Sequence, residues 1–333
     1  MEQRIKDRYS EAVLQEAMRR YDIAARQIQP LNGFESFIYE FQRGPQAYIL
    51  RLAHSLRRSE DLIRGEVDWI NTLAGGGVPV ARAIDSQAGN LVETIADGQG
   101  GWFLATAFVK AAGTHPWEAG WTPERYATYG ELLGRMHVLA QGYQPTQAAW
   151  KRPEWDDDIM EIPEHFLPAS ETAAKQKYQA LCDHLHTLPK DSASYGLIHQ
   201  DAHQSNFLMD ETGSITLFDF DDCAYSWFIN DIAIVLFYIS VEEEDAPAFT
   251  QAFLPAFLRG YRQFHALHPK WLREIPAFLK IREIELYAVI HRDFDLEDID
   301  NDWCRHFMQG RKYKIEHDLP FIDFDFEALS AYL

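Results

Sequence analysis

One stretch, residues 197–222, constrains the fold and the chemistry of this chain more than any other: LIHQDAHQSNFLMDETGSITLFDFDD. Its first half contains Asp201 and Asn206, and its second half is an apolar run that leads into Asp219. The turn-forming residues 210–213 lie between two apolar runs, which is the pattern of a β-hairpin. Such a hairpin brings Asn206 near Asp219, with Asp201 on the loop before them. The stretch therefore predicts two carboxylates and a carboxamide around one small space.

These side chains suit phosphoryl transfer from a magnesium nucleotide. Magnesium takes oxygen ligands from one or two protein groups and from the substrate phosphates, so Asn206 and Asp219 are the candidate metal ligands. Asp201 is the candidate catalytic residue, which takes or orients the proton of the attacking hydroxyl group. A single Asp or Asn in a loop is more often a turn or capping residue. The ordered set, with its apolar flanks, argues for the catalytic interpretation.

The stretch resembles the catalytic segment of the aminoglycoside phosphotransferase and choline kinase-like family, small-molecule kinases with a protein-kinase-like fold. Asp201 and Asn206 keep the five-residue spacing of the kinase catalytic loop. The family's usual His-Gly-Asp is His199-Gln200-Asp201 here, a mild departure. The resemblance implies that His199 supports the loop and that Asp231, before an apolar helix, ties the loop to that helix. The alternative for Asp231 is a plain helix cap.

Composition excludes several classes of protein. The chain has 333 residues, 47% of them hydrophobic, which is enough for two lobes with a sizeable core. Its formal net charge of -20 argues against nucleic-acid binding. That charge fits solubility or the attraction of a cationic substrate. We expect no membrane segment, no signal peptide and no disulfide framework, and therefore a reduced cytoplasmic protein. The scattered cysteines are Cys182, Cys223 and Cys304.

Residues 1–109 are expected to form a small, β-rich, nucleotide-binding lobe. A helix over residues 4–20 precedes three strands, at 25–31, 37–43 and 47–52, with a turn at 43–46. The loop between the first two strands contains Gly33 and Ser36, and its backbone N–H groups are candidates for binding nucleotide phosphates. On local sequence alone a plain hairpin turn is the alternative, but the family resemblance favours the phosphate loop.

The third strand contains Arg51 where the kinase pattern has a phosphate-contacting Lys. The next helix, predicted over residues 59–74 with Ser59 or Ser55 as its cap, offers Glu66 as the ion-pair partner, with Glu60 as the alternative. Arg and Lys differ in geometry, so this departure matters. Arg51 is alternatively a surface charge at a strand edge.

Two further runs, residues 90–95 and 101–109, are predicted to pair and to complete about five strands. The segment 107–110, at the end of the second run, is the expected hinge, and the kinase-like fold implies that its backbone, at Phe108 and Val109, meets the adenine edge. The alternative is that Phe108 is ordinary core.

Residues 110–333 are expected to form a larger, mainly helical lobe for catalysis and acceptor binding. The whole chain is then an α+β protein with a bilobal, protein-kinase-like fold. We predict an irregular insert at residues 141–168 and, from the family's helix with a G-x-x-H arrangement, a packed rather than ligating His137. One predicted helix begins at Thr122, and three more are predicted over residues 170–188, 246–268 and 270–292. An acidic run, 291–302, is either an acceptor rim or a solvated face, and the aromatic tail at 321–326 packs onto the lobe.

The sequence therefore predicts an ATP- and Mg2+-dependent kinase that phosphorylates a hydroxyl group of a small molecule. The candidate acceptors are an aminoglycoside, another amino alcohol such as homoserine or choline, and a sugar-like metabolite. The acidity of the chain favours an acceptor that carries an amine. A Ser/Thr protein kinase of the same fold is one alternative, although no A-P-E element follows Asp219. A non-catalytic nucleotide-binding scaffold is the other, and only the Lys-to-Arg departure at Arg51 favours it.

Overall fold

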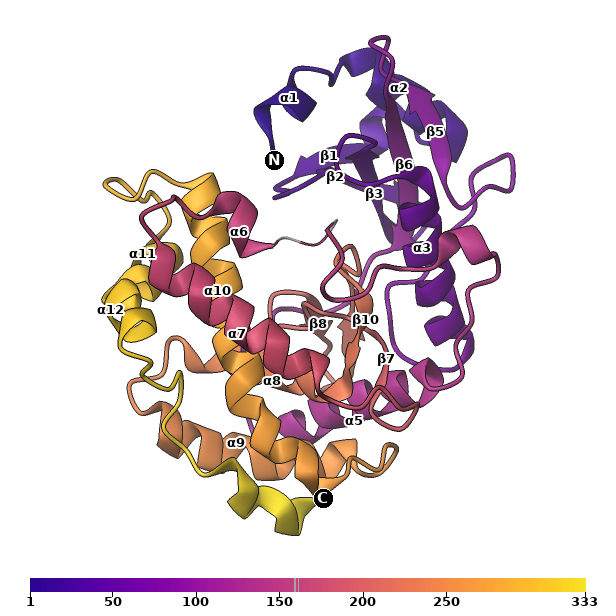
Figure 1. The fold of residues 1–333 in the computed structure, drawn as a ribbon. Coiled ribbons are helices and arrows are strands. Elements are labelled where there is room, and N and C mark those ends of the chain that lie inside the picture. The colour runs from indigo at the N-terminus through magenta and orange to yellow at the C-terminus, as the bar shows by residue number, and fades with distance from the viewer. Residues whose placement is uncertain (159, 161) are drawn as a thin grey trace. The chain divides into compact units, whose positions relative to one another are not determined.

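The computed structural model describes residues 1–158, 160 and 162–333, and these form two compact units. Unit 1 comprises Met1–Thr114, Gln144–Arg152 and Phe207–Asp221, and unit 2 comprises His115–Tyr143, Pro153–Asn206 and Asp222–Leu333. Figure 1 labels their helices and strands. Within the described ranges, every helix is too short or too polar to span a membrane.

Unit 1 is built on a six-stranded sheet in the order β1-β2-β3-β6-β4, with β5 pairing with β6. All of its pairings are antiparallel. The strands are β1 Ile28–Leu31, β2 Phe37–Arg43, β3 Gln46–His54, β4 Ala83–Ile84, β5 Glu93–Ala96 and β6 Trp102–Val109. The prediction of about five strands missed β4, which has only two residues and therefore no detectable alternation.

Strand β3 separates the two faces of this sheet because successive side chains point to opposite sides. Leu50 and Leu52 pack in the core cluster with the apolar face of α2 (Glu11–Tyr21). Arg51 lies on the other face and contacts Glu66 of α3 (Glu60–Gly75). Ser59 caps α3, because its hydroxyl accepts a hydrogen bond from the Leu62 N–H at 3.3 Å. The sheet thus separates a purely structural face from the face that bears the charged pair.

The prediction of one helix over residues 4–20 was wrong. The chain forms α1 (Gln3–Lys6) and then α2, with a break between them. Tyr9 lies in this break, where its ring stacks on Phe37 at 4.1 Å between centroids and its hydroxyl bonds Tyr39 at 2.7 Å. Tertiary packing of Tyr9 therefore overrides the local helical pattern. The first strand was also predicted too early, because residues 25–27 form the short 3-10 helix η1 (Ala25–Gln27).

Two later segments of the chain complete unit 1. The predicted hairpin forms from β8 (Phe207–Met209) and β9 (Ile215–Leu217). Isolated bridges join Leu217 to Val80 and Met209 to Thr114. The 3-10 helix η2 (Ala148–Trp150) lies against α3, where a Cβ added at Gly65 would stand 2.0 Å from the Trp150 carbonyl oxygen. Unit 1 is therefore completed by residues from far along the chain.

Unit 2 is mainly helical, with one small sheet in which β7 pairs with β10. Its helix α5 begins after Thr122, whose hydroxyl accepts a hydrogen bond from the Arg125 N–H. Helices α5 and α9 approach closely, since Cβ atoms added at Gly130 and Gly260 would stand 1.9 Å from backbone oxygens of the facing helix. The elements are α4 Pro116–Ala119, α5 Pro123–Ala140, α6 Pro163–Phe166, α7 Thr172–His186, β7 Tyr195–Ile198, β10 Ala224–Trp227, α8 Phe228–Ser240, α9 Ala246–Tyr261, η3 Pro269–Glu274, α10 Ile275–Asp293, α11 Asp302–Met308, α12 Arg311–Glu316 and η4 Phe326–Tyr332.

Two predicted helices were too long. The expected helix 246–268 ends with α9 at Tyr261, and the expected helix 270–292 begins as the 3-10 helix η3 before α10. The irregular insert 141–168 contains only the short elements η2 and α6 among its described residues, and residues 159 and 161 lie outside them. The aromatic tail packs as predicted, with Phe321 stacked on Phe237 at 4.3 Å.

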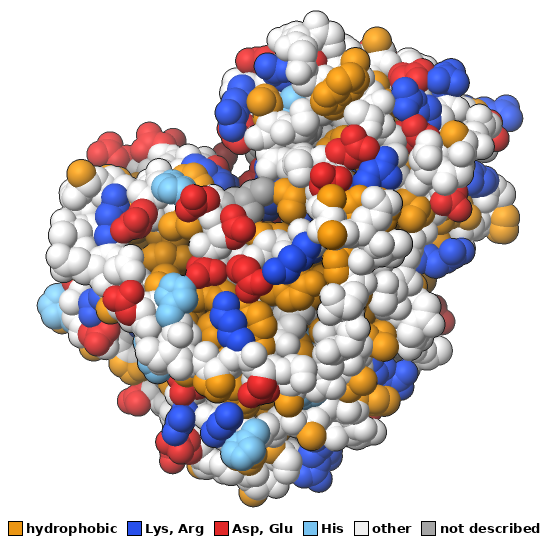
Figure 2. Space-filling model, turned by 45° about the vertical axis from the view of Figure 1, so that its right-hand side comes forward, with side chains coloured by type: hydrophobic (Ala, Val, Ile, Leu, Met, Phe, Trp, Pro, Cys, Tyr) orange, Lys and Arg blue, Asp and Glu red, His pale blue; other side chains and the backbone are white. Residues whose placement is uncertain are grey.

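On the face that Figure 2 shows, red acidic side chains are interspersed with blue basic ones and do not gather in one patch. The acidic run 291–302 begins in the last turn of α10, and its carboxylates are exposed.

Candidate active site

The loop between β7 and β8, which carries Asp201, is held at its backbone by one carboxylate of unit 2. Asp231 lies in the first turn of α8 and is fully buried. Its Oδ2 accepts a hydrogen bond from the His199 N–H at 3.0 Å, and its Oδ1 accepts one from the Gln200 N–H at 2.9 Å. These are the contacts that the sequence predicted between Asp231 and the loop.

Asp231 is in turn held by the buried His137. The Nε2 of His137 lies 3.1 Å from Asp231 Oδ2, and its Nδ1 lies 2.7 Å from the Tyr261 hydroxyl. The Tyr129 hydroxyl also donates to the carbonyl of Ala202 in the loop. His137 is therefore a packed helix residue, as expected, and it stiffens the loop through Asp231.

Gln200 occupies a backbone conformation that favours glycine, with φ of +69°. This explains why the family pattern has glycine at this position. Here the side chain compensates, because Gln200 Oε1 accepts a hydrogen bond from Asn230 Nδ2 at 3.0 Å. The departure from His-Gly-Asp thus places a residue with a side chain at positive φ, where that side chain is hydrogen-bonded to Asn230.

The Asp201 carboxylate is bound on both of its oxygens. Oδ2 accepts a hydrogen bond from Asn206 Nδ2 at 3.0 Å and lies 3.2 Å from His203 Nε2. Oδ1 accepts a hydrogen bond from Arg282 Nη2 at 2.6 Å. Burial acts to raise the pKa of Asp201, but His203 and Arg282 hold that pKa below its usual range. Asp201 is therefore an ionised, oriented hydrogen-bond acceptor.

The Asn206 side chain is oriented by the same contacts. Its Nδ2 donates to the Asp201 backbone carbonyl at 2.8 Å as well as to the carboxylate. The amide nitrogen is thus committed to Asp201, and the amide oxygen remains available as a hard ligand for a divalent cation. Among the described residues, no three His, Cys, Asp or Glu side chains form a metal cluster. A nucleotide-bound metal needs only one or two protein oxygens, so this donor set fits it.

In unit 1, Arg51 and Glu66 form the buried ion pair that the sequence predicted. Nη1 donates to Glu66 Oε1 at 2.8 Å and Nη2 donates to Oε2 at 2.6 Å. Burial acts to lower the pKa of Arg51, but the Glu66 carboxylate holds it above its usual range. Arg51 Nε is buried and has no hydrogen-bond partner within the part of the chain that the structure describes. Arg51 is therefore not a surface charge, and its unpaired Nε fits a phosphate oxygen.

The loop between β1 and β2 requires glycine at Gly33. A Cβ there would stand 2.1 Å from the Ser36 carbonyl oxygen and 2.8 Å from Ile38 Cγ1. Ser36 is buried, and the neighbouring Glu35 lies 3.4 Å from Arg57. The loop is thus folded tightly onto the start of β2.

Asp219 and Asp221 follow β9 and lie in a positively charged part of unit 1. Asp219 has φ of +63°, an uncommon conformation for a residue other than glycine and one that is concentrated at functional sites. Asp221 pairs with Arg57, and its backbone carbonyl accepts a hydrogen bond from Arg152 Nη2 at 2.6 Å. Burial acts to raise the pKa of Asp221, but Arg57 and Arg58 hold it well below its usual range. No sequence pattern predicted this cluster.

The expected hinge residues lie at the end of β6. Phe108 is buried on the same side of the sheet as Arg51, whose guanidinium carbon lies 5.1 Å from the centre of the Phe108 ring. The Val109 N–H donates to the Arg82 carbonyl at 3.0 Å. The Phe108 ring therefore borders the face that bears the Arg51–Glu66 pair.

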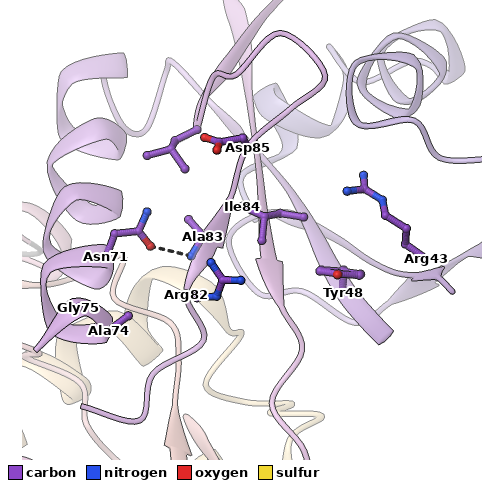
Figure 3. A pocket seen from close by; sticks show the side chains of 10 residues that line it. Arg43, Tyr48, Asn71, Ala74, Gly75, Arg82, Ala83, Ile84 and Asp85 are labelled. Carbon is purple, nitrogen blue, oxygen red and sulfur yellow. Dashed lines mark hydrogen bonds between the residues drawn. The ribbon is translucent and has the colours of Figure 1, made fainter. Parts of the chain in front are cut away.

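A separate cavity of about 740 Å³ opens in unit 1 (Figure 3). It borders Tyr48, which is three positions before Arg51 on β3 and therefore on the opposite face of the sheet. None of the predicted site residues lines it. In Figure 3, Asn71 accepts a hydrogen bond from the Ala83 N–H, at 3.1 Å, and Arg82 lies beside this pair. The cavity is thus distinct from the residues described above.

Comparisons with known proteins show the family of this chain. Residues 27–274 match the model of the phosphotransferase enzyme family. The chain belongs to this phosphotransferase enzyme family. The phosphotransferase is 38% identical to the amicoumacin kinase of Bacillus subtilis (strain 168) over 325 residues, which cover 96% of each chain.

Two solved structures are similar to this phosphotransferase. One is the amicoumacin kinase hAmiN in complex with AMP-PNP, Ca2+ and Ami, with 37% identity and a TM-score of 0.93 over 99% of this chain and 100% of that chain. The other is a microcompartment-associated aminopropanol kinase, with 23% identity and a TM-score of 0.74 over 93% of this chain and 98% of that chain, a likeness in fold. The phosphotransferase therefore has the predicted α+β, protein-kinase-like fold and is a small-molecule kinase.

The sequence analysis missed two residues that touch Asp201, namely His203 and Arg282. His203 lies only two positions after Asp201, where nothing in the pattern marks it. Arg282 follows Phe278 and Leu279 at helical spacing, and both of these are buried. A charged residue on the buried side of a helix requires a partner, and this signal could have drawn attention to Arg282.

Proposed function

We propose that this phosphotransferase transfers the γ-phosphoryl group of ATP to a hydroxyl group of amicoumacin. The observation that carries the proposal is the 38% identity to amicoumacin kinase along 96% of both chains. The hAmiN structure adds support, because it contains an ATP analogue, a divalent cation and Ami together. The formal net charge of -20 further favours an acceptor that carries an amine.

Asp201 is the proposed catalytic residue. The acceptor hydroxyl donates its hydrogen bond to the Asp201 carboxylate, which orients the oxygen for attack on the γ-phosphorus. The new O–P bond forms as the bond to the ADP oxygen breaks, and the hydroxyl proton passes to Asp201 or from it to water. An ionised and firmly held Asp201 suits this task, because the transition state is loose and needs positioning more than a strong base. His199 and Asp231 support the loop that presents it.

Asn206 and Asp219 are the proposed ligands of a divalent cation, which we take to be Mg2+. Bound there, the ion would neutralise negative charge on the nucleotide phosphates. Asn206 has its amide oxygen available, as described above, and Asp219 contributes a carboxylate. Both are hard oxygen donors, which Mg2+ prefers.

Nucleotide binding is assigned to the amino-terminal lobe, residues 1–109, and acceptor binding to residues 110–333. Arg51 is proposed to contact phosphate through its unpaired Nε, with Glu66 fixing its orientation. The backbone around Gly33 and Ser36 is proposed to cover the phosphates. Phe108 and Val109 are proposed to border the adenine.

The test is ADP release from the purified chain with Mg2+-ATP and amicoumacin, together with mass spectrometry of the acceptor. The comparison compounds are an aminoglycoside, aminopropanol, choline and homoserine. A gain of one phosphate on amicoumacin, at a rate well above that for the comparison compounds, supports the proposal. Equal or faster phosphorylation of a comparison compound would argue against amicoumacin as the acceptor. No phosphorylation of any of the tested compounds would refute the proposed function.

A further inference from the structure

Arg282, on α10, contacts the proposed catalytic carboxylate directly. Its Nη2 donates to Asp201 Oδ1 at 2.6 Å and to the Tyr238 hydroxyl at 2.8 Å. Only 18% of the Arg282 side chain is exposed, and its Nη1 lies 3.6 Å from Glu285. A largely buried guanidinium with two partners on one nitrogen is held firmly and does not act as a mobile surface charge.

Counting the acceptor sites of Asp201 shows where a substrate hydroxyl can bind. A carboxylate offers about four lone-pair sites, two on each oxygen. Oδ2 faces two groups, Asn206 Nδ2 and His203 Nε2. Oδ1 receives one hydrogen bond, from Arg282. The remaining acceptor site is therefore on Oδ1, next to Arg282.

Tyr238, the second partner of Arg282, is itself fixed by aromatic neighbours. Its ring lies 4.4 Å from that of His203 and stacks with that of Trp303 at 5.8 Å between centroids. The Arg282 guanidinium carbon lies 5.3 Å from the Tyr238 ring centre. Helices α8, α10 and α11 thus join in fixing the direction of Asp201 Oδ1.

We propose that Arg282 is a positioning residue for phosphoryl transfer, which fixes Asp201 Oδ1 so that its remaining lone pair receives the acceptor hydroxyl. This inference rests on the proposed role of Asp201. Arg282 acts through Asp201 and not on the nucleotide, so its removal should lower kcat and leave nucleotide affinity unchanged. In the absence of Asp201 it should have nothing left to position.

The test is a double-mutant cycle of Arg282→Met and Asp201→Asn, with kcat, acceptor KM and the Kd for AMP-PNP measured for each variant. We expect Arg282→Met to lower kcat roughly 10²-fold, the loss that a misplacement of about 1 Å can cause, with the Kd for AMP-PNP unchanged within twofold. In the Asp201→Asn background, Arg282→Met should cause no further loss. A wild-type kcat for Arg282→Met, or fully additive losses in the cycle, would overturn the proposal.

Two more variants distinguish a loss of positioning from a loss of folding. Tyr238→Phe removes one hydrogen bond of Arg282 and should lower kcat several-fold in a normally folded chain; an unchanged kcat would count against the proposal. Arg292→Met is the matched control, because Arg292 is on the same helix and pairs with Asp293 at 2.7 Å. Its kcat should stay within twofold of wild type, and a loss equal to that of Arg282→Met would show a general effect of α10.

A readout without acceptor separates this proposal from the proposed function. In the wild-type chain, NMR should show hindered rotation of the Arg282 guanidinium, because Asp201 and Tyr238 hold one of its nitrogens. Free rotation would overturn the positioning role whatever the acceptor proves to be. Hindered rotation together with no phosphorylation of any compound would refute the function and leave the Arg282–Asp201 contact intact.

Discussion

Both units contain a pair of arginine and carboxylate, but the pair in unit 1 is buried and the pair in unit 2 is partly exposed. In unit 1, both oxygens of Glu66 accept hydrogen bonds from Arg51, and Arg51 Nε is left without a partner among the described residues. In unit 2, Arg282 contacts Asp201 through a single nitrogen, and the carboxylate keeps an unused acceptor site. Glu66 therefore orients Arg51, whereas Arg282 is proposed to orient Asp201.

The difference shows which member of each pair is available to a substrate. A phosphate needs a donor, and the Nε of each arginine is a buried donor without a partner among the described residues. A hydroxyl group needs an acceptor that it can reach, and the Asp201 side chain is 20% exposed whereas that of Glu66 is 1% exposed. The accessible carboxylate of the second pair is therefore the one suited to a hydroxyl group.

The largest expected effect tests the second pair. Asp201→Asn keeps the shape of the side chain but removes its charge, so it should lower kcat by roughly 10²–10⁴-fold, the range for a positioned acid–base group. The Kd for AMP-PNP should change little, because Asp201 is not a proposed nucleotide contact. Steady-state kinetics and calorimetry measure the two quantities. A variant with near wild-type kcat would remove Asp201 from the mechanism.

Breaking the first pair should instead lower stability. Glu66→Leu leaves the Arg51 guanidinium buried without its partner, which typically costs about 3–5 kcal/mol. The free energy of unfolding from urea denaturation measures this loss, and ATP affinity should fall with it. The double variant Arg51→Met with Glu66→Leu is the control, which should recover much of the stability but not the affinity. A stable Glu66→Leu variant would contradict the assigned role of the pair.

A smaller effect is expected at the loop before β2. Gly33→Ala forces a shift against the Ser36 carbonyl, so we expect KM for ATP to rise about tenfold, a change of about 1.4 kcal/mol. Acceptor KM should not change, because this loop is proposed to bind the nucleotide and not the acceptor. Gly75→Ala is the control, since a Cβ there meets no atom within 4 Å. Equal effects on both substrates would show that Gly33 serves the whole fold.

The smallest effect is expected at Gln200. Gln200→Gly relieves the cost of positive φ, roughly 1–2 kcal/mol, but loses the hydrogen bond from Asn230, worth about 1 kcal/mol. The backbone bond to Asp231 remains. The free energy of unfolding should therefore change by less than about 1 kcal/mol and kcat by less than threefold. A large loss of kcat would mean that the Gln200 side chain itself orients Asp201.

Local sequence patterns predicted the parts of the molecule that local sequence determines. Strand β2 follows from its alternation of side chains, and the cap at Ser59 follows from capping chemistry. The position of Glu66 in the middle of a predicted helix indicates it as the partner of Arg51. Tyr9 and Arg282 were misjudged or missed because their partners are distant in sequence. Arg282 lies 81 positions after Asp201, and no short pattern records that contact. Strand β4 was not predicted because two residues cannot show the alternation of polar and apolar side chains that marks a strand.

The division of unit 1 into three stretches of chain has a consequence for synthesis. Its sheet is complete by Thr114, but the β8–β9 hairpin that bridges to Val80 and Thr114 is made much later. At the translation rates typical of cells, the nascent sheet must wait roughly ten seconds for that hairpin. During this interval the backbone groups of Pro79, Ala81 and Thr114 lack their hydrogen-bond partners in the hairpin. A ribosome that stalls before the hairpin would therefore present an incomplete unit 1 to chaperones and proteases.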